Sequence, residues 1–483
     1  MTSNSIKQYA CYIDGEFVNA SSGATFAVEN PADETIWASV PDCTIEDVQR
    51  AVESSEKAQK SWQLLPAIER GNWIRKIADA LQEKRDHFAE LLVKEQGKTL
   101  AEAYGEFDDT INYLTYSAEA ARRIEGNIYP SENANEQLWI QKVPYGVTLG
   151  LCAYNYPLAL IGRKIGPALV TGNSMILKAH EATPVTAVEF CKVVDEIGLP
   201  KGVINLVSGQ GIEVSSALVT HKSTRLVSLT GSTRAGQAIY KASGENVSGL
   251  VLELGGKASF VVLNDADLDK AVEAAVISRY ANSGQVCICN ELVLVEKGIA
   301  EEFTKRVVER VKEITFGDPM SNVNMGPSVT GASIERIDGL LKDSVAMGAK
   351  VEVGGRPQGE EYKKGHWYMP TVVSDVKRDM PLATSEIFGP IMPIVVVDNY
   401  QEALEICNDR EDALSAYIFT QSMKTAFHAI NHMQVGTVFV NKMICGYIQG
   451  YHSGHKRSGT GGEDGIYGIE GYLQKRAVYF NYD

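Results

Sequence analysis

The chain has 483 residues, of which 44% are hydrophobic and 22% are charged. This length exceeds what one hydrophobic core usually supports, and the ordinary content of glycine and proline excludes collagen-like and low-complexity proteins. The net charge of −15 disfavours general binding to nucleic acid, because such a chain repels phosphate backbones on average. We therefore expect a globular protein of at least two domains that does not bind nucleic acid.

The sequence shows no signal for a membrane or a secreted location. No segment approaches the roughly 18 consecutive apolar residues of a membrane helix, and Met1–Tyr12 lacks the apolar core of a signal peptide. The eight cysteines are scattered and resemble neither a disulfide framework nor a zinc site with paired C-x2-C elements. None of the eight histidines shows metal-ligand spacing, so no metal is expected. A reduced, cytoplasmic location follows as the default.

The first third of the chain is predicted to be largely helical, and a region of alternating elements follows. Residues 45–64 and 66–103 have apolar residues every three and four positions, which predicts amphipathic helices, the first capped by Thr44. From about 146 to 256, β-rich runs alternate with helical stretches, which predicts a mostly parallel sheet with helices on both faces. The runs are 146–154, 174–179, 203–208, 226–230 and 249–254, and the helices are predicted to begin near Pro157, Thr183, Gly211 and Thr233. Such open sheets bind ligands beyond the carboxyl ends of their strands.

A second alternating block is predicted from Phe260–Leu263 to Thr437–Asn441. Its first helix is expected to continue to about Asn282, with Asn264 or Asp265 as its cap. Two segments lie outside both blocks. Residues 124–142 contain short β-like runs, and the tail 476–482 is β-prone. The tail could pair with another subunit or form an ordinary edge strand within one chain, and the pattern favours neither.

Two glycine-containing turns raise the question of a phosphate site. Gly209-Gln-Gly211 and Gly231-Ser232 each follow a predicted strand, but both lack the third glycine of the G-x-G-x-x-G fingerprint. Such turns are common as plain structural elements. A helix that starts after one can still bind an anion through its free N–H groups.

Three polar positions stand out near predicted strand ends. Cys287 and Cys289 lie one residue apart after Gly284, so on an extended chain only one of them can face a given site. Glu253 ends an apolar strand, where a carboxylate is costly unless a lysine pairs with it or it acts as a general base. Asn155 follows another strand and could offer an amide donor there, although asparagine is also a common turn residue.

These residues occur in an order and spacing that resembles the NAD(P)-dependent aldehyde dehydrogenase superfamily. The motifs are Asn155, Glu253-Leu-Gly-Gly-Lys257, Gly284-Gln-Val-Cys287 and Glu386-Ile-Phe-Gly-Pro390. The resemblance runs from Asp14-Gly15-Glu16-Phe17 to Lys456-Arg-Ser-Gly459. It is strongest to bacterial lactaldehyde dehydrogenases, which also oxidise glycolaldehyde, through motifs such as Gln449-Gly-Tyr-His452.

The resemblance implies an α/β fold of three parts and a homodimer or homotetramer. A Rossmann-like NAD-binding domain would comprise residues 1–123 and 143–254, and a second α/β catalytic domain residues 255–445. Residues 124–142 and 463–483 would form a small β oligomerisation domain.

The resemblance also implies a role for each motif residue. Cys287 would attack the aldehyde to give a thiohemiacetal and then a thioester, while the amide of Asn155 and the backbone N–H of Cys287 hold the oxyanion. Glu253 would activate the water that hydrolyses the thioester, with Lys164 near it in a proton relay. Cys289 would take no part.

The cofactor implied is NAD, with NADP less favoured. Lys178 and Glu181 match the pair that holds the adenosine ribose, and a carboxylate there repels a 2′-phosphate. His180 replaces a residue that is often small. The other matching cofactor positions are Gly211, Gly231, Ser232, Leu254, Glu386 and Phe388.

The substrate positions match the lactaldehyde enzymes only in part. Arg163 and His452 are polar positions of that subfamily, but Ile288 replaces an asparagine and Gly446 replaces a glutamate. We expect a small hydroxyaldehyde such as lactaldehyde or glycolaldehyde. The two replacements also predict a larger, less acidic pocket, in which Arg163 could pair an anionic substrate. Succinate semialdehyde or a longer aliphatic aldehyde is therefore the alternative.

Two further alternatives concern the reaction itself. The chain could be a binding or structural protein that keeps the fold without turnover. It could also pass the acyl group to coenzyme A, although acylating members of the superfamily usually lack the equivalent of Glu253.

Overall fold

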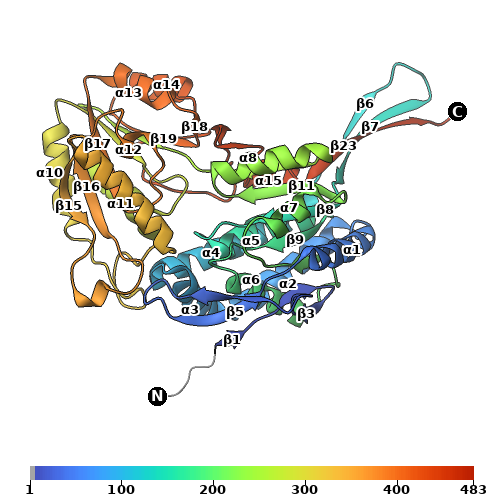
Figure 1. Ribbon diagram of the computed structural model, residues 1–483. Helices are drawn as coiled ribbons and strands as arrows, with labels where there is room; N and C mark the ends of the chain where they lie inside the picture. The colour runs from blue at the N-terminus through green and yellow to red at the C-terminus, as the bar shows by residue number, and fades with distance from the viewer. Residues whose placement is uncertain (1–5) are drawn as a thin grey trace.

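The computed structural model describes residues 6–483 and contains two large sheets with helices packed on them. Figure 1 shows the elements of the first sheet on the right, those of the second on the left, and the β6–β7 hairpin projecting beside the C-terminus. In the described part of the chain, no helix has the length and apolar character that crossing a membrane requires.

The N-terminal region forms a small sheet and four helices. Thr44 caps the first helix in a capping box with Asp47, as predicted. The single helix expected over 66–103 is wrong: the chain breaks after Gln82 and again at Gly97, which adopts a left-handed φ of 87°. The elements are β1 (Lys7–Gln8), β5 (Ile36–Pro41) and β4 (Thr25–Glu29) in sheet order, then α1 (Ile45–Trp62), α2 (Ala67–Gln82), α3 (Arg85–Gln96), α4 (Leu100–Glu119) and η1 (Ala120–Arg122).

The first large sheet has eight strands, and its central five are parallel. In spatial order they are β22 (Gly459–Thr460), β12 (Gly249–Glu253), β11 (Thr224–Thr230), β8 (Val147–Leu151), β9 (Ser174–Lys178), β10 (Ile204–Leu206), β2 (Cys11–Ile13) and β3 (Glu16–Val18). The helices are α5 (Pro157–Val170), α6 (Val185–Glu196), α7 (Glu213–Thr220), α8 (Thr233–Ala242) and η2 (Ser243–Glu245). Met175 and Leu177 join one apolar core while Ile176 joins another, so both faces of the sheet are covered. The predicted strand–helix alternation is confirmed.

The second large sheet has seven strands, of which only β15 runs antiparallel to its neighbour. Its strands in order are β15 (Lys350–Gly355), β16 (Met369–Ser374), β17 (Ile391–Val397), β14 (Leu292–Glu296), β13 (Ser259–Val262), β19 (Ser415–Phe419) and β20 (Thr437–Val440). The helices are α9 (Leu268–Tyr280), η3 (Ala281–Gly284), α10 (Ala300–Val311), α11 (Gly331–Ala346), η4 (Glu360–Tyr362), α12 (Pro381–Thr384), α13 (Tyr400–Asn408) and α14 (Met423–His432). The cap of α9 is Asp267, whose carboxylate accepts from Lys270 N, so the prediction of Asn264 or Asp265 is wrong.

The last part of the chain connects the two large sheets and completes two smaller ones. After β20 the chain pairs β21 (His455–Lys456) with β18 (Asp412–Ala413), and then adds β22 to the first sheet. After α15 (Gly465–Glu470), β23 (Leu473–Asn481) pairs with β7 (Glu136–Pro144), which in turn pairs with β6 (Asn127–Pro130). The C-terminal tail is therefore an edge strand within its own chain.

Candidate active site

A cavity of about 700 Å³ lies at the carboxyl ends of β8, β9, β11 and β12 and extends to α11 and to the loops before β14 and β17. Its position agrees with the expected place for a ligand in an open parallel sheet. The predicted residues that line it are Asn155, Lys178, Glu181, Gly211, Gly231, Ser232, Glu253, Cys287, Glu386 and Phe388. The predicted residues outside its lining are Arg163, Lys164, Leu254, Ile288, Gly446 and His452.

A strained loop carries Cys287 to this cavity. Asn282, Ser283 and Gly284 follow α9 with left-handed φ values of 47°, 57° and 75°. Only glycine fits at 284, because a Cβ there would lie 2.3 Å from the carbonyl oxygen of Gly389. Cys287 then lines the cavity, whereas Cys289 is fully buried, with its thiol 3.5 Å from the carbonyl oxygen of Gly284. Only one of the two cysteines faces the cavity, as predicted.

The Cys287 thiol lies next to a carboxylate and an imidazole. Its Sγ is 3.9 Å from His452 Nε2, and that nitrogen is 2.8 Å from Glu253 Oε1. Burial, reinforced by the negative charge of Glu253, raises the pKa of Cys287 well above its usual value. The thiol is therefore protonated at neutral pH in the cofactor-free protein, and it must lose that proton before it can act as a nucleophile.

Glu253 is held by its strand and by His452. It is the last residue of β12, and it pairs in register with Thr230 on β11 and Gly459 on β22. Within residues 6–483 no lysine forms an ion pair with it, and the nearby Lys257 instead pairs with Glu291 at 3.1 Å. The partner of Glu253 is thus the imidazole of His452, which lies close to a thiol. The lysine ion pair that would have explained this carboxylate without a catalytic role is not formed in the part of the chain that the structure describes.

Asn155 is tied to the loop that carries the cysteine. Its Nδ2 donates to the carbonyl oxygen of Gln285 at 3.1 Å, and its own carbonyl oxygen accepts from Lys98 Nζ and Asn282 Nδ2, both at 2.9 Å. Its buried Oδ1 has no hydrogen-bond partner among the described residues. The side-chain amide therefore stands beside the backbone that leads to Cys287.

Lys164 and Arg163, the basic residues predicted near Glu253 and the substrate, form ion pairs with acidic side chains. Lys164 is fully buried, and its Nζ donates to Glu463 at 2.7 Å, Thr230 at 2.9 Å and Ser228 at 3.0 Å. The Arg163 guanidinium makes a two-pronged ion pair with Asp464 and lies 3.4 Å from Glu463.

Glu463 and Asp464 were not predicted as part of the site. Burial alone would raise the pKa of Glu463, but Lys164 and Arg163 lower it to about 2. The only sequence signal is their place in the glycine-rich stretch before α15, and it does not reveal partners about 300 residues away.

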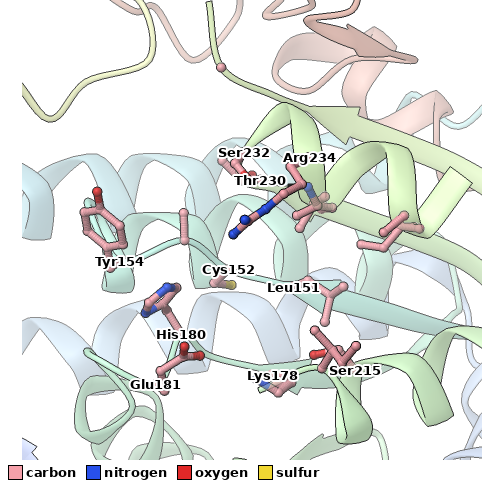
Figure 2. A pocket seen from close by; sticks show the side chains of 18 of the residues that line it. Leu151, Cys152, Tyr154, Lys178, His180, Glu181, Ser215, Thr230, Ser232 and Arg234 are labelled. Carbon is pink, nitrogen blue, oxygen red and sulfur yellow. Dashed lines mark hydrogen bonds between the residues drawn. The ribbon is translucent and has the colours of Figure 1, made fainter. Parts of the chain in front are cut away.

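The upper and lower walls of the cavity come from different turns. In Figure 2, Lys178, His180 and Glu181 lie on one side, and Thr230, Ser232 and Arg234 lie on the other. Ser232 caps α8 by accepting from Ala235 N at 3.2 Å, which leaves the first N–H groups of that helix available for an anion. Leu254 packs beneath α8: a Cβ at Gly236 would lie 2.4 Å from Leu254 Cδ1.

The wall that carries Lys178 combines charge with aromatic rings. Burial lowers the pKa of Lys178, although the carboxylate of Glu181 partly offsets this. The His180 ring packs edge-on against Tyr154, with 5.1 Å between the ring centroids. Tyr154 in turn packs edge-on against Phe388, with 6.0 Å between the centroids. Several lining residues were not predicted, because residues of these types occur throughout the sequence and only the fold brings them to the cavity. They include Tyr154, Ser215, Arg234, Ser333 and Arg336.

Glu386 and Phe388 lie on a loop that three residues fix in place. Arg336 donates to the carbonyl oxygen of Glu386 at 2.8 Å, and Glu291 accepts from Phe388 N at 3.0 Å. The carboxylate of Glu386 accepts from Gly256 N at 3.1 Å. Burial and the nearby charge of Glu291 raise the pKa of Glu386 to about 7.

These features together fit a dinucleotide. A helix N-terminus suits its diphosphate, and the carboxylates of Glu181 and Glu386 can accept hydrogen bonds from ribose hydroxyls. The cavity volume of about 700 Å³ is in the range of cofactor sites.

Comparisons with known proteins agree with this chemistry. The model of the aldehyde dehydrogenase family matches residues 17–478. The chain is 40% identical to 3,6-anhydro-alpha-L-galactose dehydrogenase of Vibrio sp. (strain EJY3), over 99% of this chain and 100% of the relative. It is 41% identical to lactaldehyde dehydrogenase of Escherichia coli (strain K12), over 98% of each protein. A solved structure of 3,6-anhydro-L-galactose dehydrogenase in complex with NAP superposes with a TM-score of 0.97, at 42% identity, over 98% of this chain and 100% of that one.

Proposed function

The chain belongs to the aldehyde dehydrogenase family, and we propose that it oxidises a small hydroxyaldehyde to the carboxylic acid with NAD, using Cys287 as the nucleophile. The observation that carries this proposal is the meeting of a thiol, an amide and a carboxylate, from Cys287, Asn155 and Glu253, at one cavity. Aldehyde oxidation through a covalent thioester needs these three kinds of group.

The first chemical step joins the aldehyde to the protein. The Cys287 thiol releases its proton to water in the cavity, and its sulfur then attacks the aldehyde carbon to give a thiohemiacetal. The Nδ2 of Asn155 holds the developing oxyanion, and losing one such donor typically costs about 10²–10³-fold in rate. A bound nicotinamide dinucleotide supplies the hydride acceptor.

Hydrolysis of the thioester on Cys287 completes the reaction. Glu253 takes a proton from the attacking water, and its hydrogen bond to His452 orients the carboxylate. Lys164 contacts Thr230, the residue paired with Glu253 across two strands. These contacts support a place for Lys164, which donates to the Thr230 hydroxyl, in the proton relay of Glu253. The presence of Glu253 favours water over coenzyme A as the acyl acceptor.

The choice of NAD over NADP rests on Glu181. Its carboxylate lines the cavity two residues after Lys178 and would repel a 2′-phosphate. Members of the family bind NAD(P), so the two cofactors need direct comparison.

A neutral substrate fits the charges of the site better than an anionic one. Arg163 is already paired with Asp464 and Glu463, so its charge is not free to bind a second carboxylate. His452 stands next to Cys287 and can hydrogen-bond a substrate hydroxyl. These points favour lactaldehyde or glycolaldehyde over succinate semialdehyde and longer aliphatic aldehydes.

The two large sheets and the sheet of β6, β7 and β23 support the proposed division of the chain. The proposed parts are an NAD-binding domain of residues 1–123 and 143–254, a catalytic domain of residues 255–445, and an oligomerisation domain of residues 124–142 and 463–483. Except for β22, the eight-stranded sheet lies in the first part; the seven-stranded sheet lies within the second, and β6, β23 and most of β7 lie within the third. We propose a homodimer or homotetramer.

A panel of aldehydes with both nucleotides tests the proposal. We expect the highest kcat/KM with lactaldehyde or glycolaldehyde and NAD, and formation of free acid without coenzyme A. Cys287→Ala should abolish turnover while leaving NAD binding intact. A clear preference for succinate semialdehyde would reject the substrate, and dehydrogenase activity in the Cys287→Ala variant would reject the nucleophile.

A further inference from the structure

Three possible metal ligands meet in the cavity. Glu253, Cys287 and His452 each offer one ligand atom, and these three atoms all lie within 4.8 Å of one another. His452 comes from the segment between β20 and β21, Glu253 from the end of β12, and Cys287 from the loop after η3. Because they are more than 30 residues apart in the chain, no spacing motif indicates them.

The geometry is close to that of a zinc site. Zinc binds sulfur at about 2.3 Å and nitrogen or oxygen at about 2.0–2.2 Å, so tetrahedral ligand atoms lie roughly 3.4–3.6 Å apart. The observed separations are 3.9 Å between Cys287 Sγ and His452 Nε2, and 2.8 Å between His452 Nε2 and Glu253 Oε1. Each differs from the tetrahedral spacing by less than about 1 Å, which side-chain rotations can supply.

The charge balance also favours a cation. A thiolate and a carboxylate would give the group two negative charges, and the buried cations Arg163 and Lys164 are already paired with Asp464 and Glu463. Glu253 and Cys287 also line the cavity, so an ion can enter there, and a fourth coordination position stays open to water.

We propose that Glu253, Cys287 and His452 bind a thiophilic divalent cation, zinc above all, and that the bound ion reversibly blocks aldehyde oxidation. On binding, the Cys287 thiol releases its proton to solvent and its sulfur forms a bond to the ion. His452 binds through Nε2, and the proton that this nitrogen donates to Glu253 moves to Nδ1. No electron is transferred. The ion occupies the sulfur electron pair that would attack the aldehyde and the carboxylate that would activate water.

The test measures metal binding directly. Cofactor-free protein is dialysed against Zn²⁺ and its metal content is determined, and Co²⁺ is used in parallel because a cobalt–thiolate bond absorbs in the near ultraviolet. We expect one ion per chain, a cobalt–thiolate band, and inhibition of turnover that a chelator reverses.

Matched variants assign the ligands. His452→Ala should weaken Zn²⁺ binding by more than about tenfold, since even partners outside the first coordination sphere are worth about 10–100-fold. Cys287→Ser should lose the cobalt–thiolate band. His455→Ala, at an exposed histidine three residues along, and Cys445→Ser, at another partly exposed thiol, should bind Zn²⁺ as the wild type does.

Two results would overturn the proposal: an unchanged Zn²⁺ affinity in His452→Ala, or a cobalt complex without the thiolate band. The binding measurements require no turnover. A protein that binds zinc but oxidises no aldehyde would contradict the proposed function alone, and an active protein that binds no zinc would contradict only the metal site.

Discussion

Two titratable side chains of the cavity lie where ionisation is costly. Glu386 shows this most clearly, because it is only partly exposed in the cavity wall, lies near Glu291 and receives one hydrogen bond, from Gly256 N. The Cys287 thiol is in a similar state, held protonated by burial and by Glu253. The surroundings of both groups raise their pKa values, and such shifts are typical of functional sites.

The raised pKa of Glu386 predicts a pH-dependent stability. Its folded pKa of about 7 exceeds the ordinary 4.5, so the folded state binds more protons between these values and stability falls as pH rises through that window. Glu386→Gln removes this effect. Relative to wild type, the variant should gain up to about 2 kcal/mol in free energy of unfolding between pH 5.5 and 8.5. Urea unfolding of the cofactor-free proteins at the two pH values measures this gain, and an equal difference at both would contradict it.

Glu253→Gln should separate the two halves of the reaction. If Glu253 activates water, acyl transfer to Cys287 still occurs but its hydrolysis slows, and general-base catalysis is typically worth about 10²–10⁴-fold. Stopped-flow absorbance should show a burst of about one NADH per active site followed by slow turnover. Glu245→Gln, at an exposed glutamate, is the control and should behave as wild type. Absence of a burst would assign Glu253 to an earlier step.

At the scale of elements, the junction between α3 and α4 fixes the start of α5. Lys98 is buried there, where its Nζ pairs with Glu106 at 2.5 Å, donates to the carbonyl oxygen of Asn155, and lies 3.9 Å from the ring centroid of Tyr156. Glu106 in turn accepts from the backbone N–H groups of residues 158 and 159, in the first turn of α5. This buried ion pair therefore positions the Asn155 backbone.

A double-mutant cycle tests whether Lys98 acts through Asn155. Lys98→Met should lower kcat and, by leaving Glu106 unpaired, cost about 3–5 kcal/mol of stability. In an Asn155→Ala background, Lys98→Met should lower kcat no further, when both are measured well below the unfolding temperature. An additive loss of kcat would show that Lys98 does not act through Asn155. Lys98→Met/Glu106→Gln, which removes both charges, should recover much of the stability.

Local patterns predicted most elements, because strand and helix periodicities depend only on neighbouring residues. Helix starts were predicted near Pro157 and Thr233, and α5 and α8 begin at these residues. The errors also arose locally. Gly97 ends α3, whereas the apolar periodicity predicted that the helix would continue. Asp267 caps α9 in place of the two nearby polar residues that were predicted as its cap.

The site was predictable only where a motif is contiguous. Glu253 and Cys287 lie in recognisable motifs, and the structure brings both to the cavity. The partner of Lys164 is 299 residues away, and no pattern in the sequence connects the two. The pairing of Arg163 with Asp464 is equally non-local, and it alters the expectation for the substrate.

At the scale of the whole molecule, the sheet β23-β7-β6 extends away from both large sheets (Figure 1). Its aromatic and aliphatic side chains are unusually exposed, with Ile128 at 73% and Tyr479 at 71%. The rings of Trp139 and Phe480 stack on this sheet, with their centroids 5.4 Å apart. Exposed apolar surface of this kind is typical of an interface between subunits.

Charged substitutions in this sheet should therefore disrupt the proposed oligomer. Ile128→Lys/Tyr479→Lys should lower the molar mass measured by analytical ultracentrifugation, because burying two new charges at an interface is unfavourable. Leu64→Lys, at a residue 81% exposed between α1 and α2, is the control and should leave the mass unchanged. An unchanged mass in the double variant would place the interface elsewhere.

The late return of the chain to the first sheet has a consequence for biosynthesis. When a ribosome has completed β20, Arg163 and Lys164 on α5 have already emerged, but Glu463 and Asp464, which neutralise them, have not. Two cations cannot be buried without counter-charges, so this face of α5 must stay hydrated until the segment that carries Glu463 and Asp464 has been made. A polypeptide released before that point would keep this face open, which exposes it to chaperones and proteases.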